Sequence, residues 1–422
     1  MKVSIRKLKT GFLYTILIMS FANASLRLNA SGFSTLYRLV SPIPVIMIIM
    51  SDRNRLKKTL FVFLSWIVYS LIVSVFYHNI SINYHVNLIY LMVLYIIVDK
   101  IRFINNDFDT SFFSFLDTVT NILLVLAFLQ MIVHEAYPYV RISPKRTIVN
   151  LFFTNENEFA EPLSCIAIIY MVRQFVKKER KYLIRTLVIF IIVYLNDAKF
   201  CLLGLLFGAL LTTAYMDTSR KKNKHRGGNR RLIIGVIVTL IIILVLSMGN
   251  FTLKFQGYNI SFNDLITKNV AKIINGEAYS SGGGSIIDRT NAIIYGLGEL
   301  KNTYLFGIGF GNSVYMLSMP QYTLLSAQSM HNIFFQLICE FGYVAMIGYF
   351  LLGKKVIQGI REDANWMNVL KLIYFLSFIL ISSQSSVGIL SNYMTWTITF
   401  YIALLGNKGV QSKRLYDLRV FT

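Results

Sequence analysis

The sequence predicts an all-α polytopic membrane protein with about 12 transmembrane helices and one large extracytoplasmic loop that carries short amphipathic helices. Three observations support this fold class. The 422 residues are 55% hydrophobic and 15% charged, with a mean hydropathy of +0.57, which is too apolar for an ordinary soluble enzyme. Apolar runs of nearly bilayer length recur along the chain. Lys and Arg gather in short segments between those runs, as the positive-inside rule requires.

The chain is expected to divide into three parts. Residues 1–249 would hold the first nine membrane helices, 250–330 the large loop, and 331–422 the last three helices and a cytoplasmic tail. The predicted membrane helices lie near 10–28, 34–50, 59–77, 84–99, 117–134, 158–175, 182–196, 199–217, 232–249, 331–352, 367–384 and 388–406. The seventh and eighth follow each other so closely that we expect a helical hairpin.

The positions of the cations set the predicted orientation. With the N-terminus inside, the segments that hold most of the 42 Lys and Arg residues all face the cytoplasm. These segments are 2–9, 53–58, 100–102, 173–185, 220–231, 354–371 and 408–419. Both termini are therefore predicted to be cytoplasmic, and the basic start of the chain, which resembles a signal peptide, is interpreted as the beginning of an uncleaved first helix. The run RKKNKHRGGNRR at 220–231 is interpreted as an orienting loop rather than a nucleic-acid site, so no nucleic-acid partner is expected.

Four segments then fall on the outer side: 135–157, 196–199, 385–387 and the long loop at 250–330. A loop of that length is usually functional or disordered. Within it, FNDLITKNVAKIING and DRTNAIIYGLGELKN read as short amphipathic helices that can lie at the membrane interface, joined by a flexible Ser/Gly link. The outer side is therefore where we expect a functional site.

Few cations are left outside, which makes them candidate binding residues. The ones we single out are Arg141, Lys145, Arg146, Lys199 and Arg289. Arg offers a planar fork of donors suited to diphosphate, whereas Lys acts as a compact charge. The alternative interpretation is that these side chains are solvated or contact lipid headgroups.

A Gly-rich turn and a histidine accompany Arg289. Gly309 and Gly311 let the backbone adopt positive φ or approach a ligand closely. His331 titrates near neutral pH and so can accept or donate a proton, although a lone histidine at a helix start is more often a cap. Asn332 beside it offers an amide to orient a group, and Glu340 follows about two and a half turns later. These residues suit an anionic amphiphile; they leave the reaction open.

Metal and redox chemistry are not indicated by the sequence. The three cysteines, Cys165, Cys201 and Cys339, lie in apolar runs, which predicts neither a disulfide framework nor a zinc site. No acidic cluster occurs in the outer segments. We therefore expect no metal and no cofactor.

These motifs resemble the O-antigen polymerase and ligase superfamily of Wzy/WaaL-like membrane proteins. Its pattern is an Arg and a helix, then a Pro/Leu-Phe-Gly-Ile-Gly-x-Gly-Asn turn, then His-Asn-x-x-x-Gln-x-x-x-Glu-x-Gly-x-x-x-x-x-Gly at the start of a membrane helix. The matching residues here are Arg289, 305–312, His331, Asn332, Gln336, Glu340, Gly342 and Gly348. TNENEFA at 154–160 is similar to the family's Asn-Pro-Asn-x-x-Ala, with Asn157 on its second Asn and Glu156 in place of Pro. Arg146 takes the place of the preceding Arg, and Lys199 replaces an Arg, losing bidentate geometry.

The resemblance implies metal-independent glycosyl transfer on the outer face of the bacterial cytoplasmic (inner) membrane. The donor would be a glycan on undecaprenyl diphosphate and the acceptor another lipid-linked repeat unit. His331 and Arg289 would be catalytic, with His331 as base or diphosphate ligand. The substrate-binding residues would be Arg146, Lys199, Arg141, Asn157, Asn332, Gly309 and Gly311. Membrane lipids, a chain-length regulator and a flippase would be further partners.

Three interpretations remain beside the leading one, which is a repeat-unit polymerase for O-antigen or capsule. A ligase that moves the finished glycan to a lipid or protein acceptor would share the Arg and His motifs. A flippase for the same lipid-linked glycan belongs to a different class, but transporters tend to carry ionisable groups near the midplane and repeated halves. A structural scaffold for an assembly complex is the last alternative.

Overall fold

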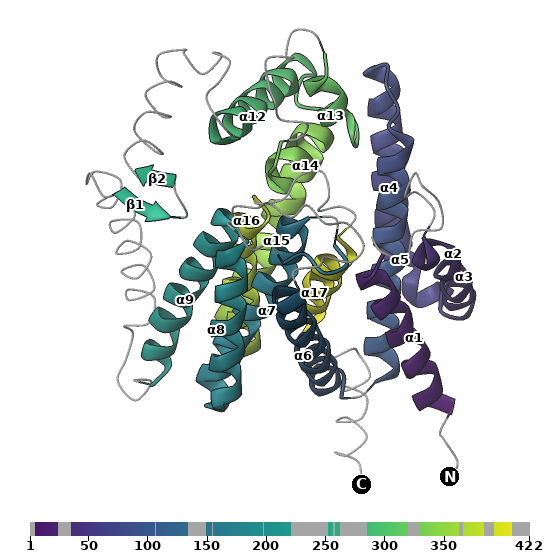
Figure 1. The fold of residues 1–422 in the computed structure, drawn as a ribbon. Helices are drawn as coiled ribbons and strands as arrows, with labels where there is room; N and C mark the ends of the chain where they lie inside the picture. The colour runs from purple at the N-terminus through teal and green to yellow at the C-terminus, as the bar shows by residue number, and fades with distance from the viewer. Residues whose placement is uncertain are drawn as a thin grey trace.

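The computed structural model of the chain is a bundle of helices with one small β-hairpin (Figure 1). It describes residues 5–23, 35–105, 107–133, 149–153, 155–196, 198–220, 252–255, 258–261, 285–319, 330–362, 366–383 and 392–406. Among the predicted features, the helices at 232–249 and 262–276 lie outside these residues, as do Arg141, Lys145 and Arg146. The helical class is confirmed, and the number of membrane crossings stays a prediction.

The helices of the N-terminal part follow the predicted order. They are α1 (Ile5–Phe21), α2 (Leu36–Val40), α3 (Pro42–Ser51), α4 (Arg53–Phe76), α5 (Ile82–Ile104), α6 (Phe108–Val133), α7 (Glu156–Lys177), α8 (Arg180–Leu195) and α9 (Lys199–Arg220). The helix predicted near 34–50 is divided at Ser41, where α2 ends and Pro42 starts α3. Proline suits a first helical turn because its missing N–H would have had no partner there.

The C-terminal part contains the predicted large loop and the helices after it. Its elements are β1 (Thr252–Phe255), β2 (Tyr258–Ser261), α12 (Ser285–Asn302), α13 (Asn312–Leu317), α14 (Ile333–Phe341), α15 (Tyr343–Glu362), α16 (Trp366–Ile381) and α17 (Tyr393–Leu404). The two strands pair antiparallel and were not predicted. The helix α12 confirms one of the two amphipathic helices expected in the loop. Figure 1 shows α12 and α13 at the opposite end of the molecule from the first turn of α1.

Three of the described helices are long and apolar enough to cross a membrane: α4, α6 and α7. Most of α7 is buried within the protein, whereas most of α4 is exposed. A buried apolar helix forms the centre of a bundle, and an exposed one presents its apolar surface to a hydrophobic surrounding. These helices make the chain an integral membrane protein by composition and length.

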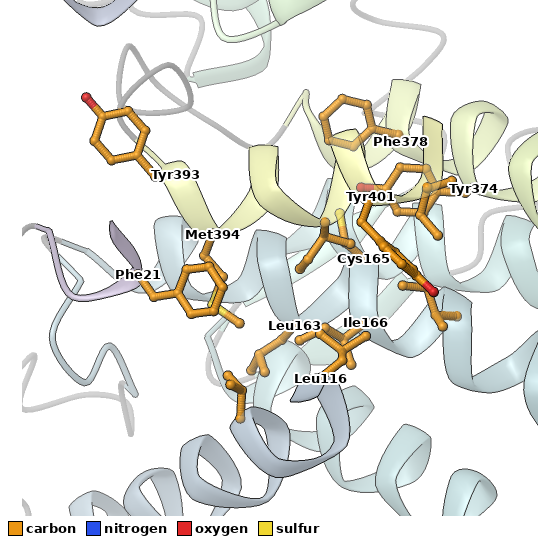
Figure 2. Packing of buried hydrophobic residues seen from close by; sticks show 14 of the residues in the cluster. Phe21, Leu116, Leu163, Cys165, Ile166, Tyr374, Phe378, Tyr393, Met394 and Tyr401 are labelled. Carbon is orange, nitrogen blue, oxygen red and sulfur yellow. The ribbon is translucent and has the colours of Figure 1, made fainter. Parts of the chain in front are cut away.

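The core lies around α7, which packs against α8, α9, α16 and α17. Glycines on α9 permit close packing, since a Cβ at Gly204 would lie 2.5 Å from Ile381 Cγ1. Aromatic rings fill the rest. Tyr374 stacks on Phe378 with their ring centroids 5.8 Å apart, and both belong to the buried cluster that includes Cys165 of α7 (Figure 2).

The helix predicted at 331–352 is divided at Gly342 into α14 and α15. Gly342 has a φ of +58°, and a Cβ there would lie 2.5 Å from the carbonyl carbon of Phe306. The main chain of the preceding loop occupies that space, and the Tyr343 N–H donates to the Leu305 carbonyl at 2.9 Å. The break therefore follows from docking of the Gly-rich turn, and not from the hydrophobic pattern.

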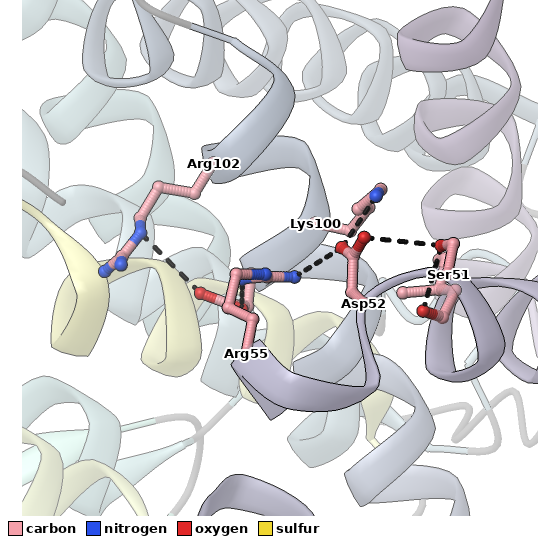
Figure 3. A network of polar contacts seen from close by, with 7 residues as sticks. Ser51, Asp52, Arg55, Lys100 and Arg102 are labelled. Atoms are coloured by element: carbon pink, nitrogen blue, oxygen red, sulfur yellow. Dashed lines mark hydrogen bonds and ion pairs between the residues drawn. The ribbon is translucent and has the colours of Figure 1, made fainter. Parts of the chain in front are cut away.

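A network of charges ties the start of α4 to the last turns of α5 (Figure 3). Asp52 bonds Lys100 at 2.7 Å and Arg55 at 3.1 Å, while Arg55 also pairs with Asp99. Arg102 lies 3.6 Å from Asp99. All five residues lie in or beside segments predicted to be cytoplasmic. Shared partners make such a network more effective than isolated surface pairs.

Candidate functional site

The Gly-rich turn from Gly307 to Asn312 has the backbone that the sequence predicts. Gly307, Gly309 and Gly311 have φ values of +89°, +87° and +81°. The close approach, however, is to the chain itself. A Cβ at Gly309 would lie 2.8 Å from Ser74 Cα. At Gly307 it would lie 2.5 Å from the Glu340 carbonyl oxygen, and at Gly311 it would strike the Tyr84 ring. Close packing against the rest of the chain therefore explains why glycine is needed at these positions. Close approach of a ligand to Gly309 and Gly311 stays a prediction.

Asn312 fastens this turn to the connection between α4 and α5. Its amide Nδ2 donates to the carbonyls of Ile308 at 2.6 Å and Asn79 at 2.9 Å. Its Oδ1 accepts from Asn79 Nδ2 at 2.7 Å and from Ser81 Oγ at 3.1 Å. Because the side chain is wholly buried, losing these partners would leave polar atoms unsatisfied. The motif named Asn312, but its partners could not be inferred from it.

A buried histidine supports the turn from the other side. His85 Nδ1 lies 3.0 Å from the Ser81 carbonyl oxygen, which can only accept, so this nitrogen carries the proton. In the neutral ring, Nε2 then accepts from Ser70 Oγ at 3.0 Å. Ser70 Oγ in turn accepts from the Phe310 N–H at 2.9 Å. His85 is therefore a structural residue of α5 that holds the turn through Ser70.

Glu340 forms its hydrogen bonds with the Gly-rich turn, α13 and α14. Its carboxylate oxygen Oε1 accepts from Ser313 Oγ at 2.5 Å and Gln336 Nε2 at 3.1 Å. Its main-chain oxygen accepts from the Gly309 N–H at 2.9 Å. The wholly buried carboxylate therefore joins α13 to α14. These contacts give Glu340 a structural role in the motif.

The helix that carries Arg289 packs against the segment that begins at Met330. The Cys339 thiol donates to the Gly296 carbonyl at 3.4 Å, and a Cβ at Gly296 would collide with the end of the Met330 side chain. Ala292 belongs to the same buried cluster. Position 289 lies three residues earlier in α12, about one helical turn. Arg289 therefore lies in a helix whose later residues, Ala292 and Gly296, pack against Met330 and Cys339.

His331 has an uncommon backbone conformation, with a φ of +47°. It lies between Met330, packed beside Gly296, and Asn332, which caps α14. Asn332 Oδ1 accepts from two N–H groups of the first turn at 3.0 and 3.1 Å, and Nδ2 donates to Ser383 Oγ at 2.6 Å. Asn332 thus has a capping role that the sequence did not indicate, while its predicted contact with substrate stays a prediction. Unusual φ values held by flanking contacts are typical of functional positions.

Two further predicted residues, Lys199 and Asn157, lie close in sequence to Asn196 or to a residue that it bonds. Asn196 itself lies at the tip of the α8–α9 hairpin. Asn196 Oδ1 accepts from the Val149 N–H at 2.8 Å, and Nδ2 donates to the Val149 carbonyl at 2.7 Å. The same Nδ2 reaches the Glu156 carbonyl at 3.3 Å. Lys199 starts α9 three residues later, and Asn157 follows Glu156 in the first turn of α7. Asn196 was not singled out in the sequence, because an Asn at a hairpin tip is ordinary turn chemistry.

Contacts of the α16 C-terminus involve residues near both Lys199 and His331. Cys201 lies two residues after Lys199, and its thiol is 4.0 Å from the Ile381 carbonyl. Two residues after Ile381, Ser383 accepts the bond from Asn332. Lys199 and His331 are therefore each within two residues of a contact with the same end of α16. The described members of the predicted site lie on or beside α7, α9, α12 and α14 and in the Gly-rich turn before α13, and that they form one site stays a prediction.

Arg38 is a further cation near this region that the sequence analysis missed. Its guanidinium donates to Asn87 Oδ1 and, at 3.3 Å, to the Tyr393 hydroxyl. Tyr393 follows Asn392, whose Nδ2 donates to the Glu158 carbonyl at 2.8 Å. An Arg inside a predicted membrane helix was the available signal, since ionisable residues there are functional candidates.

Comparison with known proteins bears on the same residues. Residues 184–350 match the family described as O-antigen ligase, Wzy_C. That stretch includes Lys199, Arg289, the Gly-rich turn and His331, and it leaves out Asn157 and the positions 141 and 146. No curated protein matches the sequence. Among the residues that the structure describes, no group of three or more His, Cys, Asp or Glu could hold a metal ion. The match covers less than half of the chain and supports a relation of residues 184–350 to the O-antigen polymerase and ligase superfamily.

Proposed function

We propose that this protein is a repeat-unit polymerase of O-antigen or capsule biosynthesis. It joins oligosaccharides linked to undecaprenyl diphosphate on the outer face of the bacterial cytoplasmic membrane. The observations that support this best are three contacts of segments that carry predicted residues. The helix of Arg289 packs against Met330 through Gly296. Asn332 donates to Ser383, and the Cys201 thiol, two residues after Lys199, lies near the Ile381 carbonyl. A cation-lined, titratable site at the end of a membrane helix suits an anionic lipid-linked donor.

In the proposed reaction the acceptor hydroxyl oxygen attacks the anomeric carbon of the donor glycan. The bond between that carbon and the diphosphate oxygen breaks, so direct displacement inverts the anomeric centre. His331 takes the hydroxyl proton. Arg289, with Arg146 and Lys199, stabilises the charge that develops on the departing undecaprenyl diphosphate. The donor is already activated by its leaving group, so the paired carboxylates of glycosidases are not needed.

The geometry supports a fixed position for His331. Asn332 anchors its C-terminal side to α16, and Met330 packs on its N-terminal side beside Gly296. A catalytic base must stay within hydrogen-bond reach of the proton it takes, and small displacements are costly. The contacts on both sides of His331 supply such a constraint.

The test is the surface glycan of the source cell after deletion of this gene, with complementation by variants. We expect wild type to restore a ladder of chain lengths, and Arg289→Ala and His331→Ala to leave a core that carries one repeat unit. Arg361→Ala is the control, because Arg361 is an exposed cation in the last turn of α15. Full activity of His331→Ala in membranes would show that His331 is not the base.

A ligase is the second candidate, because the matching family is described as O-antigen ligase. The same gel separates the two functions. Loss of even the single unit, with polymerised glycan still linked to the membrane lipid, would identify a ligase. Single repeat units trapped on the cytoplasmic face would identify a flippase and overturn the proposal.

A further inference from the structure

We propose that the region where α6 meets the α7–α8 connection binds the headgroup phosphate of an anionic phospholipid. Arg173 of α7 and Arg185 of α8 are its ligands, and with Asp117 of α6 they form what we call the two-arginine site. The α7–α8 connection belongs to the segment 173–185, which is predicted to face the cytoplasm. The site is therefore separate from the outer segments to which the proposed reaction is assigned, and lipid binding there does not depend on that reaction.

Asp117 is shared by two arginines from different helices. Its Oδ1 lies 3.4 Å from Nη1 of Arg173 and 3.1 Å from Nη1 of Arg185. The Arg185 contact is an ion pair without a hydrogen bond, so this buried nitrogen has no hydrogen-bond acceptor. Among the residues that the structure describes, no other carboxylate lies within ion-pair distance of either guanidinium. One negative charge therefore faces two permanent positive charges, which favours a further anion.

Aromatic rings hold the two guanidiniums in place. Arg173 lies over the rings of Phe113 and Tyr182, with its Cζ 4.4 Å from each ring centroid. Arg185 lies over the ring of Tyr170, at 5.5 Å. The two arginine side chains are 11% and 15% exposed, so they are mostly covered and still reach the surface. Stacking uses the flat face of a guanidinium and leaves the N–H groups at its edge able to bind a phosphate oxygen.

The connection between α7 and α8 adds positive charge around the site. Lys177, Lys178, Arg180 and Lys181 are all exposed. Glu179 pairs with Lys181 at 2.5 Å, so its charge is already matched. Cations therefore outnumber carboxylates here. Basic sites between membrane helices on the cytoplasmic side are typical binding places for anionic lipid headgroups.

Exposed apolar side chains continue from the two-arginine site along both neighbouring helices. Ile122 and Val125 follow Asp117 on α6, and Leu187 and Ile191 follow Arg185 on α8; all four are exposed. Acyl chains beside a bound headgroup would cover this surface, and burial of apolar area favours binding. A free phosphate would gain nothing from it. The charge and the apolar surface together therefore favour a phospholipid over a soluble anion.

The experiment uses native mass spectrometry to count lipids that stay bound to the purified full-length protein. The probes are phosphatidylglycerol, phosphatidylcholine with the same acyl chains, and the soluble headgroup glycerophosphoglycerol. Wild type is compared with Arg185→Gln, Arg185→Lys and Asp117→Asn. The matched control is Lys178→Gln, because it removes an exposed cation from the same helical connection and leaves both arginines in place.

We expect Arg185→Gln to bind phosphatidylglycerol about fivefold more weakly and phosphatidylcholine as wild type does. Arg185→Lys should also bind it more weakly, because it keeps the charge but loses the planar fork. Asp117→Asn should bind it more tightly, since the competing carboxylate is removed.

Equal losses in Arg185→Gln and Lys178→Gln would indicate unspecific attraction to the basic connection and overturn the proposal. Weaker binding by a folded Asp117→Asn protein would also overturn it. If that variant fails to fold, the comparison of Arg185→Lys with Lys178→Gln decides the outcome. Binding of glycerophosphoglycerol as tight as that of phosphatidylglycerol would refute the assignment of the ligand as a lipid.

Discussion

Replacement of Gly309 by Ala tests whether the Gly-rich turn is built for packing against α4. The added Cβ would lie 2.8 Å from both Ser74 Cα and Ser74 N. These are main-chain atoms of a helix, which cannot rotate away as a side chain end can. The variant must therefore displace the turn, α4 or both.

The expected cost has two parts. An L-residue at a φ of +87° costs roughly 1–2 kcal/mol, and overpacking at a close contact costs roughly 1–3 kcal/mol. We therefore expect Gly309→Ala to lower the free energy of unfolding by about 2–5 kcal/mol. Displacement of the turn also breaks the Gly309 N–H bond to Glu340, so activity should fall together with stability.

The assay is thermal or denaturant unfolding of the purified protein in detergent, beside the glycan ladder in cells. Gly353→Ala is the control, because a Cβ there meets nothing within 4 Å in the helix α15. That control should be stabilised by roughly 0.5–1 kcal/mol. If Gly309→Ala were as stable as the control but inactive, the glycine would serve ligand approach and our packing argument would be refuted.

Two further predictions concern other contacts. Gly296→Ala should reduce polymerisation more than Gly298→Ala in the same helix. Only the first change displaces Met330 beside His331, because a Cβ at Gly298 meets nothing within 4 Å. Equal activities of the two variants in the ladder assay would show that the position of Met330 does not matter. Asp52→Asn should lower stability at neutral pH by about 1 kcal/mol, with the exposed Asp107→Asn as control. Burial alone would raise the pKa of Asp52, but the hydrogen bonds and charges of Lys100 and Arg55 hold that pKa below its usual 3.8. The stabilisation is thus present above that ordinary value and is lost as the pH falls through the lower folded pKa, so the two proteins should converge in acid unfolding.

Much of the candidate site could be predicted from residue types. The apolar runs predicted the helical class, and positive φ at the glycines of the turn followed from their spacing. The amphipathic pattern of DRTNAIIYGLGELKN predicted α12. Such local features depend on neighbouring residues, which a sequence displays directly.

The divided helices show where a hydrophobic pattern is insufficient. Residues 331–352 are apolar enough for one membrane helix, yet Gly342 breaks them because the Leu305–Gly307 main chain docks there. Likewise, the sequence showed Glu340 in the same motif as His331 but could not show that its carboxylate bonds Ser313, 27 residues away. In both cases a distant segment decides the local outcome.

The sequence by itself determined the membrane character, the order of the motifs and the residues able to meet an anionic substrate. Only the tertiary structure decided which segments contact one another and which hydrogen bonds hold them. Asn312 meets Asn79 across 233 residues of chain, and Asn196 meets Val149 across 47. Periodicity and propensity are properties of neighbours along the chain, so they carry no information about such partners. The packing of whole helices decides which polar groups meet over long distances in the chain. Once packing has buried an amide such as that of Asn312 or Asn196, the groups beside it must complete its hydrogen bonds.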